Sequence, residues 1–173
     1  MKKVKNRLYL DYEKEEQWIN DMVQEGWHLK KFMFFRFTFE KGEQGSYIYR
    51  NEFLGGRTVE EENNYIEFLK ESDIEVVYKF GGWAYFRRKA SKGPFEIYTD
   101  TSSKVSYFNR ILSVFIALFL VNLMFGIINL AISQAAPYLS VVSFIAAIVI
   151  LIPIVIILRR KKALQEQQNL FEQ

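Results

Sequence analysis

The amino-acid sequence predicts an N-terminal α+β domain followed by a two-helix transmembrane hairpin. Charged side chains occur throughout the first 110 residues and are then absent from Ile111 to Leu158. Within the first part, stretches with an apolar residue at every second position, which are typical of strands, alternate with stretches of helical period. This order of elements favours a ferredoxin-like βαββαβ(β) two-layer sandwich.

The first half of the domain is predicted to contain one strand, one helix and two further strands. Residues 6–12 alternate as a short strand, and residues 13–24 place their apolar side chains on one helical face, with Gly26 ending the helix. Residues 27–40 are rich in aromatic residues and predict a single long strand. A glycine-containing turn then leads into the strand predicted for residues 46–53.

The second half begins with a helix signal. Thr58 followed three residues later by Glu61 fits a capping box, so a helix is expected to start there. Residues 74–80 and 83–88 alternate as strands, and the Gly81-Gly82 pair between them permits a tight turn. The N-terminal domain is therefore expected to end near the Ser-Lys-Gly-Pro stretch after the last strand.

The uncharged stretch is long enough for two membrane spans, residues 111–133 and 137–158, because about 20 helical residues cross a bilayer core. Lys104 and Arg110 precede the first span, a basic cluster follows the second, and the connecting turn has no basic residue. Basic residues stay on the cytoplasmic side, so both termini are expected there. The expected parts are a cytosolic domain (1–93), a linker (94–110), the hairpin (111–158) and a tail (159–173).

Composition argues against several classes of site. The chain has no cysteine, and His28 is the only histidine, so neither a thiolate nor a multi-histidine metal site is expected. We expect His28 to be a partly buried structural residue. The N-terminal part is nearly neutral, which argues against binding to nucleic acid. No nucleotide-binding glycine motif is present, and we expect neither a cofactor nor an enzymatic activity.

Aromatic residues are more frequent than a small sandwich needs, since 23 of the 29 Phe, Trp and Tyr residues precede Ile111. One interpretation is that some of them line a ligand groove, where rings stack on organic molecules and an arginine orients an anionic group. The other is that they fill the core or rest on the bilayer. The candidate ligand-binding residues are Tyr47, Tyr49, Arg50, Trp83 and Tyr85.

The predicted spans each carry a stripe of small and polar residues at helical spacing. Such stripes are typical of helix packing in membranes, because they allow close backbone approach and interhelical hydrogen bonds. The two stripes would pair within one chain or between chains. They consist of Asn122, Gly126, Asn129 and Ser133 on the first span, and of Ser140, Ser143 and Ala147 on the second.

Several short motifs carry a family resemblance. They are Trp18-Ile19-Asn20-Asp21-Met22, Gly26-Trp27-His28-Leu29, Phe39-Glu40-Lys41-Gly42-Glu43, Tyr47-Ile48-Tyr49-Arg50, Gly81-Gly82-Trp83-Ala84-Tyr85-Phe86-Arg87 and Gly93-Pro94-Phe95-Glu96-Ile97-Tyr98. In this order they resemble the DUF2812 family of bacterial membrane proteins. The resemblance implies a Gram-positive source, a gene often placed beside a PadR-type repressor, and settings of drug or envelope stress. It assigns no catalytic residue.

Two functions follow as hypotheses. The first is a membrane-anchored sensor or regulatory adaptor, whose cytosolic domain binds a small molecule or a protein such as a PadR-type regulator. The second is an accessory subunit of a transporter or other membrane complex, which docks through the hairpin as a partner or forms a homo-oligomer. In both, the lipid bilayer is a partner. Basic residues at and after the end of the last strand (Arg87, Arg88, Lys89 and Lys92) would either meet lipid headgroups or be an ordinary solvated cluster.

Overall fold

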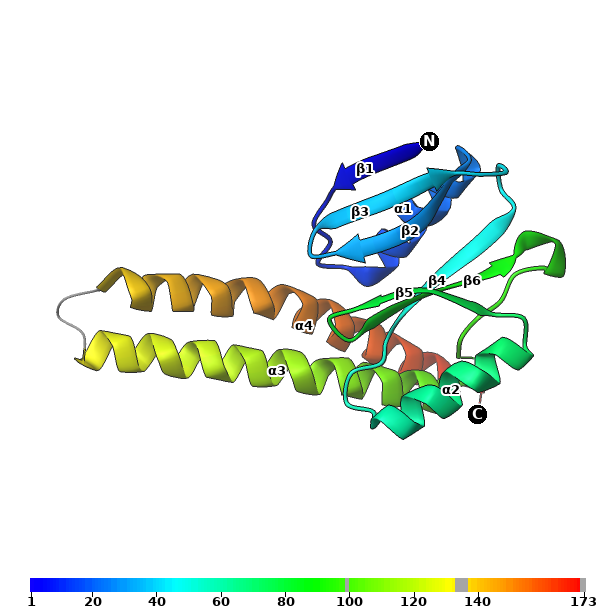
Figure 1. The fold of residues 1–173 in the computed structure, drawn as a ribbon. Coiled ribbons are helices and arrows are strands. Elements are labelled where there is room, and N and C mark those ends of the chain that lie inside the picture. Colours follow the sequence, from blue (N-terminus) through cyan, green and yellow to red (C-terminus); the bar gives the residue numbers. More distant parts are fainter. Residues whose placement is uncertain (99, 133–136, 172–173) are drawn as a thin grey trace. The chain divides into compact units, whose positions relative to one another are not determined.

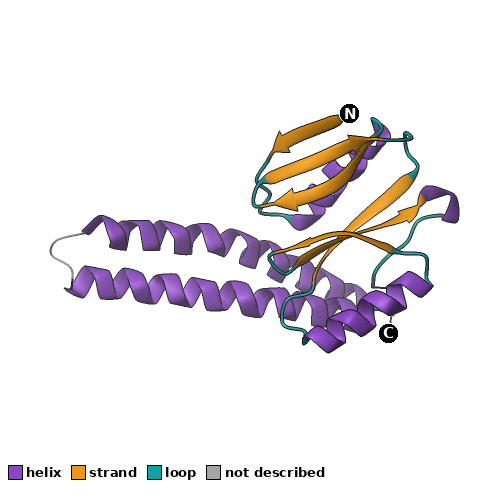
Figure 2. Ribbon diagram, viewed as in Figure 1, coloured by secondary structure: helices purple, strands orange, loops and turns teal. Residues whose placement is uncertain are grey.

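A computed structural model describes residues 1–98, 100–132 and 137–171 of the chain (Figures 1 and 2). It divides into two compact units, Met1–Ile97 and Tyr98–Gln173. The first unit is α+β and the second is a hairpin of two long apolar helices, so the predicted fold class is confirmed. The strands form two three-stranded sheets, which refines the expected sandwich.

The N-terminal unit is built from two halves with the same order of elements. Each half runs strand, helix, strand, strand, and in each the third strand lies between the other two, antiparallel to both. The first half contains β1 (Lys2–Asn6), α1 (Tyr12–Gln24), β2 (Trp27–Met33) and β3 (Arg36–Lys41). The second contains β4 (Tyr47–Phe53), α2 (Val59–Glu71), β5 (Glu75–Phe80) and β6 (Trp83–Lys89), followed by the short helix η1 (Ala90–Lys92).

Two apolar cores hold this unit together. The larger lies between α1, the β1–β3–β2 sheet and one face of the β4–β6–β5 sheet; its buried residues are Ile19, Met22, Val23, Leu29, Phe37, Phe39, Tyr49 and Tyr85. The second lies on the opposite face of the β4–β6–β5 sheet, where Leu69 of α2 packs. Helix α1 thus belongs to the first half in sequence but completes its packing against the second.

The strand predicted for residues 27–40 is wrong in one respect, because it is two strands joined by a tight turn. Phe34 adopts a left-handed backbone conformation, with φ 50°, and β2 and β3 pair on either side of it. No glycine, asparagine or proline marks this turn, so the sequence pattern carried no signal for it. Of the alternating phenylalanines, Phe37 and Phe39 are buried, whereas Phe34 and Phe35 are exposed.

The first predicted strand is also misplaced. Strand β1 covers Lys2–Asn6, and residues 7–11 form the connection to α1, whose N-cap is Asp11. The apolar residues that suggested a strand there, Leu8 and Leu10, are exposed. β1 exists because it pairs with β3, and its lysines suit the free edge of a sheet, where charge discourages pairing with another chain.

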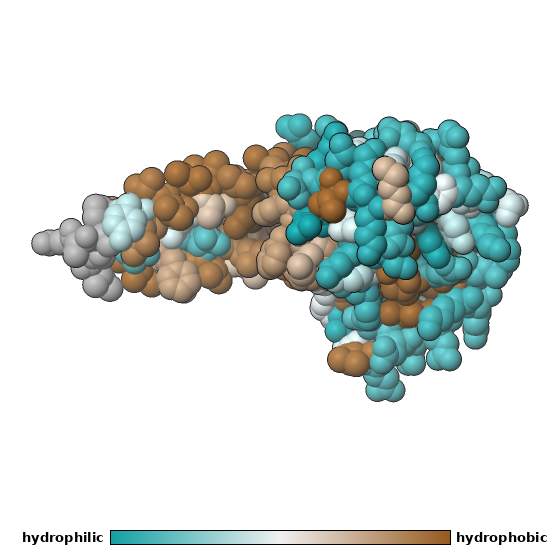
Figure 3. Space-filling view, turned by 45° about the horizontal axis from the view of Figure 1, so that its top comes forward, coloured by the Kyte–Doolittle hydropathy of each residue, from teal (hydrophilic) through white to brown (hydrophobic). Residues whose placement is uncertain are grey.

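The second unit contains α3 (Thr101–Ile132) and α4 (Pro137–Phe171), which pack against each other. The stretches Thr101–Ala131 and Tyr138–Gln168 are each long and apolar enough to cross a membrane. Figure 3 shows hydrophobic side chains along the hairpin, whereas the surface of the first unit is mostly hydrophilic. Both helices extend beyond the uncharged stretch, and outside it Lys161 donates a hydrogen bond to Asn109 over 2.7 Å.

Candidate functional site

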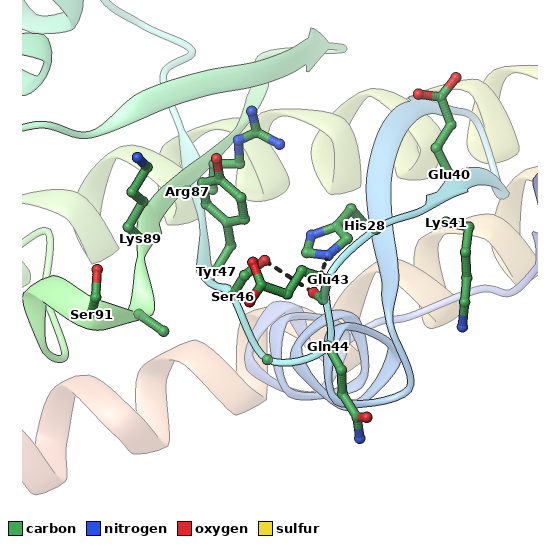
Figure 4. A pocket seen from close by; sticks show the side chains of 13 residues that line it. His28, Glu40, Lys41, Glu43, Gln44, Ser46, Tyr47, Arg87, Lys89 and Ser91 are labelled. Carbon is green, nitrogen blue, oxygen red and sulfur yellow. Dashed lines mark hydrogen bonds between the residues drawn. The ribbon is translucent and has the colours of Figure 1, made fainter.

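A pocket of about 660 Å³ lies in the first unit, where the loop between β3 and β4 faces the end of β6 and η1 (Figure 4). His28 on β2 forms part of its wall. The remaining side chains come from segments far apart in sequence: Glu40 and Lys41 at the end of β3, Glu43, Gln44 and Ser46 in the loop, Tyr47 on β4, Arg87 and Lys89 on β6, and Ala90 and Ser91 in η1. We call this cavity the His28 pocket.

The imidazole of His28 is the most informative group in the pocket. It is 8% exposed, and its Nε2 lies 2.7 Å from the backbone carbonyl oxygen of Glu43. A carbonyl oxygen only accepts hydrogen bonds, so Nε2 carries a proton, and in the neutral ring Nδ1 is an acceptor. Nδ1 is buried and has no hydrogen-bond partner among the described residues. A buried polar atom without a partner is costly.

The loop above His28 is held in a fixed position by backbone hydrogen bonds to the C-terminal end of α1. The amide of Gly42 donates to Gly26 over 3.1 Å, and the amide of Gly45 donates to Val23 over 3.0 Å. Gly42 passes so close to the imidazole that a Cβ atom there would lie 2.4 Å from Cδ2 of His28. The pocket wall is therefore preformed, and Gly42 is required for its shape.

Aromatic and cationic groups stack beside the imidazole. The ring of Tyr47 meets His28 edge to face at 5.6 Å, and the guanidinium of Arg87 lies 4.2 Å from the centre of the Tyr47 ring. Arg87 is itself held by Glu75, whose carboxylate accepts from its Nε over 2.8 Å. Tyr47 and Arg87 are therefore fixed as one wall of the pocket.

The charged groups around the pocket have both signs. Lys41 donates to the carbonyl of Glu25 over 3.1 Å, so it is already engaged. Lys89 is exposed and forms no ion pair within 4 Å in the part of the chain that the structure describes, although it lies near enough to Asp73 to help lower the pKa of that carboxyl. Glu43 also lines the pocket. The site thus offers an ammonium group, carboxylates and hydroxyl groups, which suits a small polar molecule.

The structure does not gather the five predicted ligand-binding residues into one site. Tyr47 lines the His28 pocket, but Tyr49 and Tyr85 are buried in the larger core. Trp83 lies at the other end of β6, between Tyr12 and Phe53.

Arg50 belongs to a separate polar cluster, where its guanidinium pairs with Glu16 at 3.3 Å and with Glu96 at 3.0 Å. These pairs engage both terminal nitrogens of the guanidinium, and its Nε is buried without a hydrogen-bond partner among the described residues.

Helix α1 carries that polar cluster along the free edge of β4. The Asn20 side chain accepts from the Tyr49 amide over 2.8 Å and donates to the Tyr49 carbonyl over 3.0 Å. Glu16 accepts from the Asn51 amide over 3.0 Å. The two side chains take the place of a neighbouring strand and satisfy the backbone of an edge that would otherwise be buried without partners.

Two carboxyl groups of α1 have perturbed acidity. Burial raises the pKa of Glu16 to about 7, and the nearby Arg50 offsets part of this effect. Burial also raises the pKa of Glu15, which accepts a hydrogen bond from the Tyr85 hydroxyl over 2.6 Å. Because both groups are engaged by neighbours within the fold, they serve its structure.

The predicted stripes of the hairpin lie largely where α3 and α4 meet. Gly126, Ser140 and Ala147 are buried, and a Cβ atom at Gly126 would lie 2.7 Å from the ring of Phe144. Asn122 and Ser143 are not fully buried, and each donates to a carbonyl four residues earlier in its own helix. Asn129 is half-buried, and Ser133 lies outside the described residues.

Sequence reasoning missed the groups that define the pocket. His28 was expected to be structural, which its contact with Glu43 supports, but the free Nδ1 is visible only in three dimensions. Arg87 and Lys89 were noted only as a basic cluster. Among residues 1–98, 100–132 and 137–171, no group of three metal-ligating side chains comes together.

Comparison with known proteins gives one result. The chain matches the family described as "Protein of unknown function (DUF2812)" over residues 11–120. The match runs from the N-cap of α1, through both halves of the first unit and the His28 pocket, into α3. Searches of curated proteins and of solved structures found no match. Since the match covers more than half of the sequence, the chain belongs to the DUF2812 family.

Proposed function

We propose that this chain is a membrane-anchored sensor or regulatory adaptor, whose N-terminal unit binds a small polar molecule in the His28 pocket. The observation that carries the proposal is a preformed cavity of about 660 Å³, whose polar and charged lining comes from both halves of the first unit. That volume falls within the range of small-molecule sites. An enzymatic function has less support, because His28 and Ser46 each hydrogen-bond to the Glu43 carbonyl and not to each other.

The hairpin supplies the anchor in this proposal. The most apolar windows of α3 and α4 are only 17% and 22% buried, which is unlike the core helix of a soluble protein. Large exposed apolar surfaces need a cover, and lipid provides one. Basic residues flank the stretch from Ile111 to Leu158, so both spans cross the cell membrane with the two termini on the cytoplasmic side.

The signal that such a sensor transmits follows from the family resemblance alone. We propose a response to drugs or envelope stress, with a PadR-type repressor as the protein partner in the cytoplasm. Ligand binding would change the surface around the β3–β4 loop and η1, because both segments line the pocket. That surface is where such a partner would detect the ligand.

A pocket-filling variant tests the proposal. Ser91→Trp places a large ring at an exposed position that lines the cavity, and Asn64→Trp places the same ring at an exposed position on α2, away from the pocket. The full-length chain would be purified from cell membranes in mild detergent and analysed by native mass spectrometry. We expect a small-molecule adduct in the wild type and in Asn64→Trp, and its loss in Ser91→Trp. The same adduct in Ser91→Trp, or none in the wild type, would contradict the ligand site.

The anchoring is tested separately by cysteine labelling, because the natural chain has no cysteine. Cysteines are introduced singly at Gln134 and Gln173, and intact cells are treated with a membrane-impermeant thiol reagent. We expect labelling at position 134 only. Labelling of intact cells at position 173 with protection at 134 would reverse the orientation.

A second candidate function is an accessory subunit of a membrane complex. It is favoured by the same exposed apolar surface, because a neighbouring protein helix covers such a face as well as lipid does. Affinity purification from detergent distinguishes the two candidates. A transporter that co-purifies with the isolated hairpin favours the accessory subunit, and a cytosolic regulator that requires the first unit favours the sensor.

A further inference from the structure

The turn between β2 and β3 presents two phenylalanine rings to solvent. Phe34 is 68% exposed and Phe35 is 57% exposed, next to Met33 at 41%. Phe34 has a φ of 50°, a left-handed conformation that a bulky side chain rarely adopts. Glycine or asparagine would adopt it more easily, so the turn carries two large apolar rings where neither the core nor the backbone requires them.

The turn is held in shape although its rings are exposed. The amide of Arg7 donates to the Phe35 carbonyl over 2.9 Å, which ties the turn to the segment after β1. The Phe34 ring meets Phe80 edge to face at 5.0 Å. The two rings are therefore presented on a supported hairpin tip. We call residues 33–36 the aromatic tip.

Behind the aromatic tip lies the uncovered face of the β1–β3–β2 sheet. Leu29, Phe37 and Phe39 point to the opposite face, where α1 packs. On the uncovered face a hollow of about 240 Å³ is lined by Lys31, Met33, Arg36 and Thr38. The hollow and the tip share Met33 and Arg36, so they form one continuous surface.

This surface is basic. Its charged side chains are Lys2, Lys30, Lys31, Arg36 and Glu40. The single carboxylate is shared by Lys2 and Lys30, each 3.9 Å from Glu40. Lys31 and Arg36 lie nearest to the tip, and no described acidic side chain pairs with either; the Lys31 ammonium lies 5.9 Å from the Tyr78 ring.

The covalent connection places this unit near the bilayer. The first unit ends at Ile97, and the uncharged stretch begins at Ile111. Most of the residues between them belong to α3, which starts at Thr101 and rises about 1.5 Å per residue. So short a tether gives the unit a high effective concentration at the membrane surface.

We propose that the aromatic tip and the basic sheet face dock the first unit onto an anionic lipid bilayer. Phe34 and Phe35 enter the interfacial region, which aromatic rings favour. Lys31 and Arg36 bind lipid phosphate groups in the hollow, since basic side chains are attracted to the anionic surface. This surface shares only Glu40 with the His28 pocket, and the proposal rests on the membrane anchoring proposed above.

The experiment uses the full-length chain in vesicles, with a polarity-sensitive NBD fluorophore on a cysteine at the tip (Phe35→Cys). A cysteine at the exposed Asn63 of α2 provides the control site. Vesicles contain phosphatidylcholine alone or mixed equally with phosphatidylglycerol, and lipids brominated on their acyl chains report depth. Flotation first establishes that the chain is incorporated.

In the anionic vesicles we expect a blue shift and bromine quenching at position 35, and neither at position 63. Both signals should be lost in neutral vesicles and in the Lys31→Gln/Arg36→Gln variant, but kept in the matched Lys14→Gln/Lys70→Gln variant. A chain that does not float with the vesicles would overturn the anchoring and the docking together. A chain that floats but gives the same emission at position 35 in both vesicle types, or responds to duplex DNA instead, would overturn the docking alone.

Discussion

The hydrogen bonds between α1 and the edge strand β4 predict how much a substitution of Asn20 lowers the free energy of unfolding. Replacing Asn20 with alanine removes the acceptor for the Tyr49 amide and the donor to the Tyr49 carbonyl. Tyr49 is 1% exposed, so water is poorly placed to replace either contact. The Tyr49 carbonyl still accepts a hydrogen bond from Nη1 of Arg50 over 3.1 Å, so only the Tyr49 amide is left without a partner. An unsatisfied buried polar group costs about 1–3 kcal/mol, and the free energy of unfolding should fall by that amount.

Tryptophan fluorescence measures this change in the full-length chain. The three tryptophans, Trp18, Trp27 and Trp83, all lie in the first unit, so denaturation followed by their emission reports that unit even when the hairpin is held in a micelle. Asn63→Ala is the matched control, because Asn63 is exposed on α2, where alanine costs nothing. We expect an unchanged or slightly higher midpoint for the control and a clear decrease for Asn20→Ala.

The isosteric variant Asn20→Asp makes the test more specific. Aspartate keeps an acceptor for the Tyr49 amide but turns a charged oxygen toward the carbonyl, so it should not restore the wild-type stability. If Asn20→Ala and Asn63→Ala differ by less than about 0.5 kcal/mol, within the usual scatter of surface substitutions, then α1 does not act as the missing neighbour of β4.

Two further predictions concern a carboxyl group and the hairpin. Burial raises the pKa of Glu16 to about 7 in the folded chain, above its usual 4.5, so the folded state binds the extra proton. The contribution of Glu16 to the free energy of unfolding should fall by up to about 3 kcal/mol as pH rises from 4.5 to 7. Glu16→Gln should reduce the slope, and Glu15, whose pKa burial also raises, accounts for what remains. An unchanged slope in Glu16→Gln would assign it to another group. At Gly126 a side chain has no room beside Phe144, so Gly126→Leu should weaken cross-linking between cysteines placed on α3 and α4. The double variant Gly126→Leu/Phe144→Ala should restore the cross-linking. Equal cross-linking in all variants would show that the contact between Gly126 and Phe144 is unimportant.

Structural features formed by residues close together in the sequence were predicted well. The capping box at Thr58 and Glu61 forms as expected, with both reciprocal hydrogen bonds, because its partners are three residues apart. The Gly81-Gly82 turn also forms, with positive φ at both glycines. The apolar hairpin was visible because an uncharged stretch long enough for two bilayer crossings is typical of membrane-spanning helices.

Features that depend on distant partners were not predictable in the same way. β1 was misplaced because its lysine-rich sequence becomes a strand only beside β3. The His28 pocket combines a strand, a loop and a short helix, and no spacing in the sequence connects His28 with Lys89. Asn20 carried no signal either, since its role depends on a strand edge 29 residues away.

The repeated halves of the first unit differ in how they protect their outer strands. In the first half, β1 is a free sheet edge that its lysines protect from pairing with another chain. In the second half, the edge strand β4 is covered by α1, which belongs to the first half in sequence. The two halves therefore depend on each other, because the larger core and the β4 edge both need α1. The His28 pocket lies at the same junction, with His28 and the β3–β4 loop on one side and Arg87 on the other. A ligand there would contact both halves, so its binding free energy would act on their association, which is the arrangement that a sensor requires.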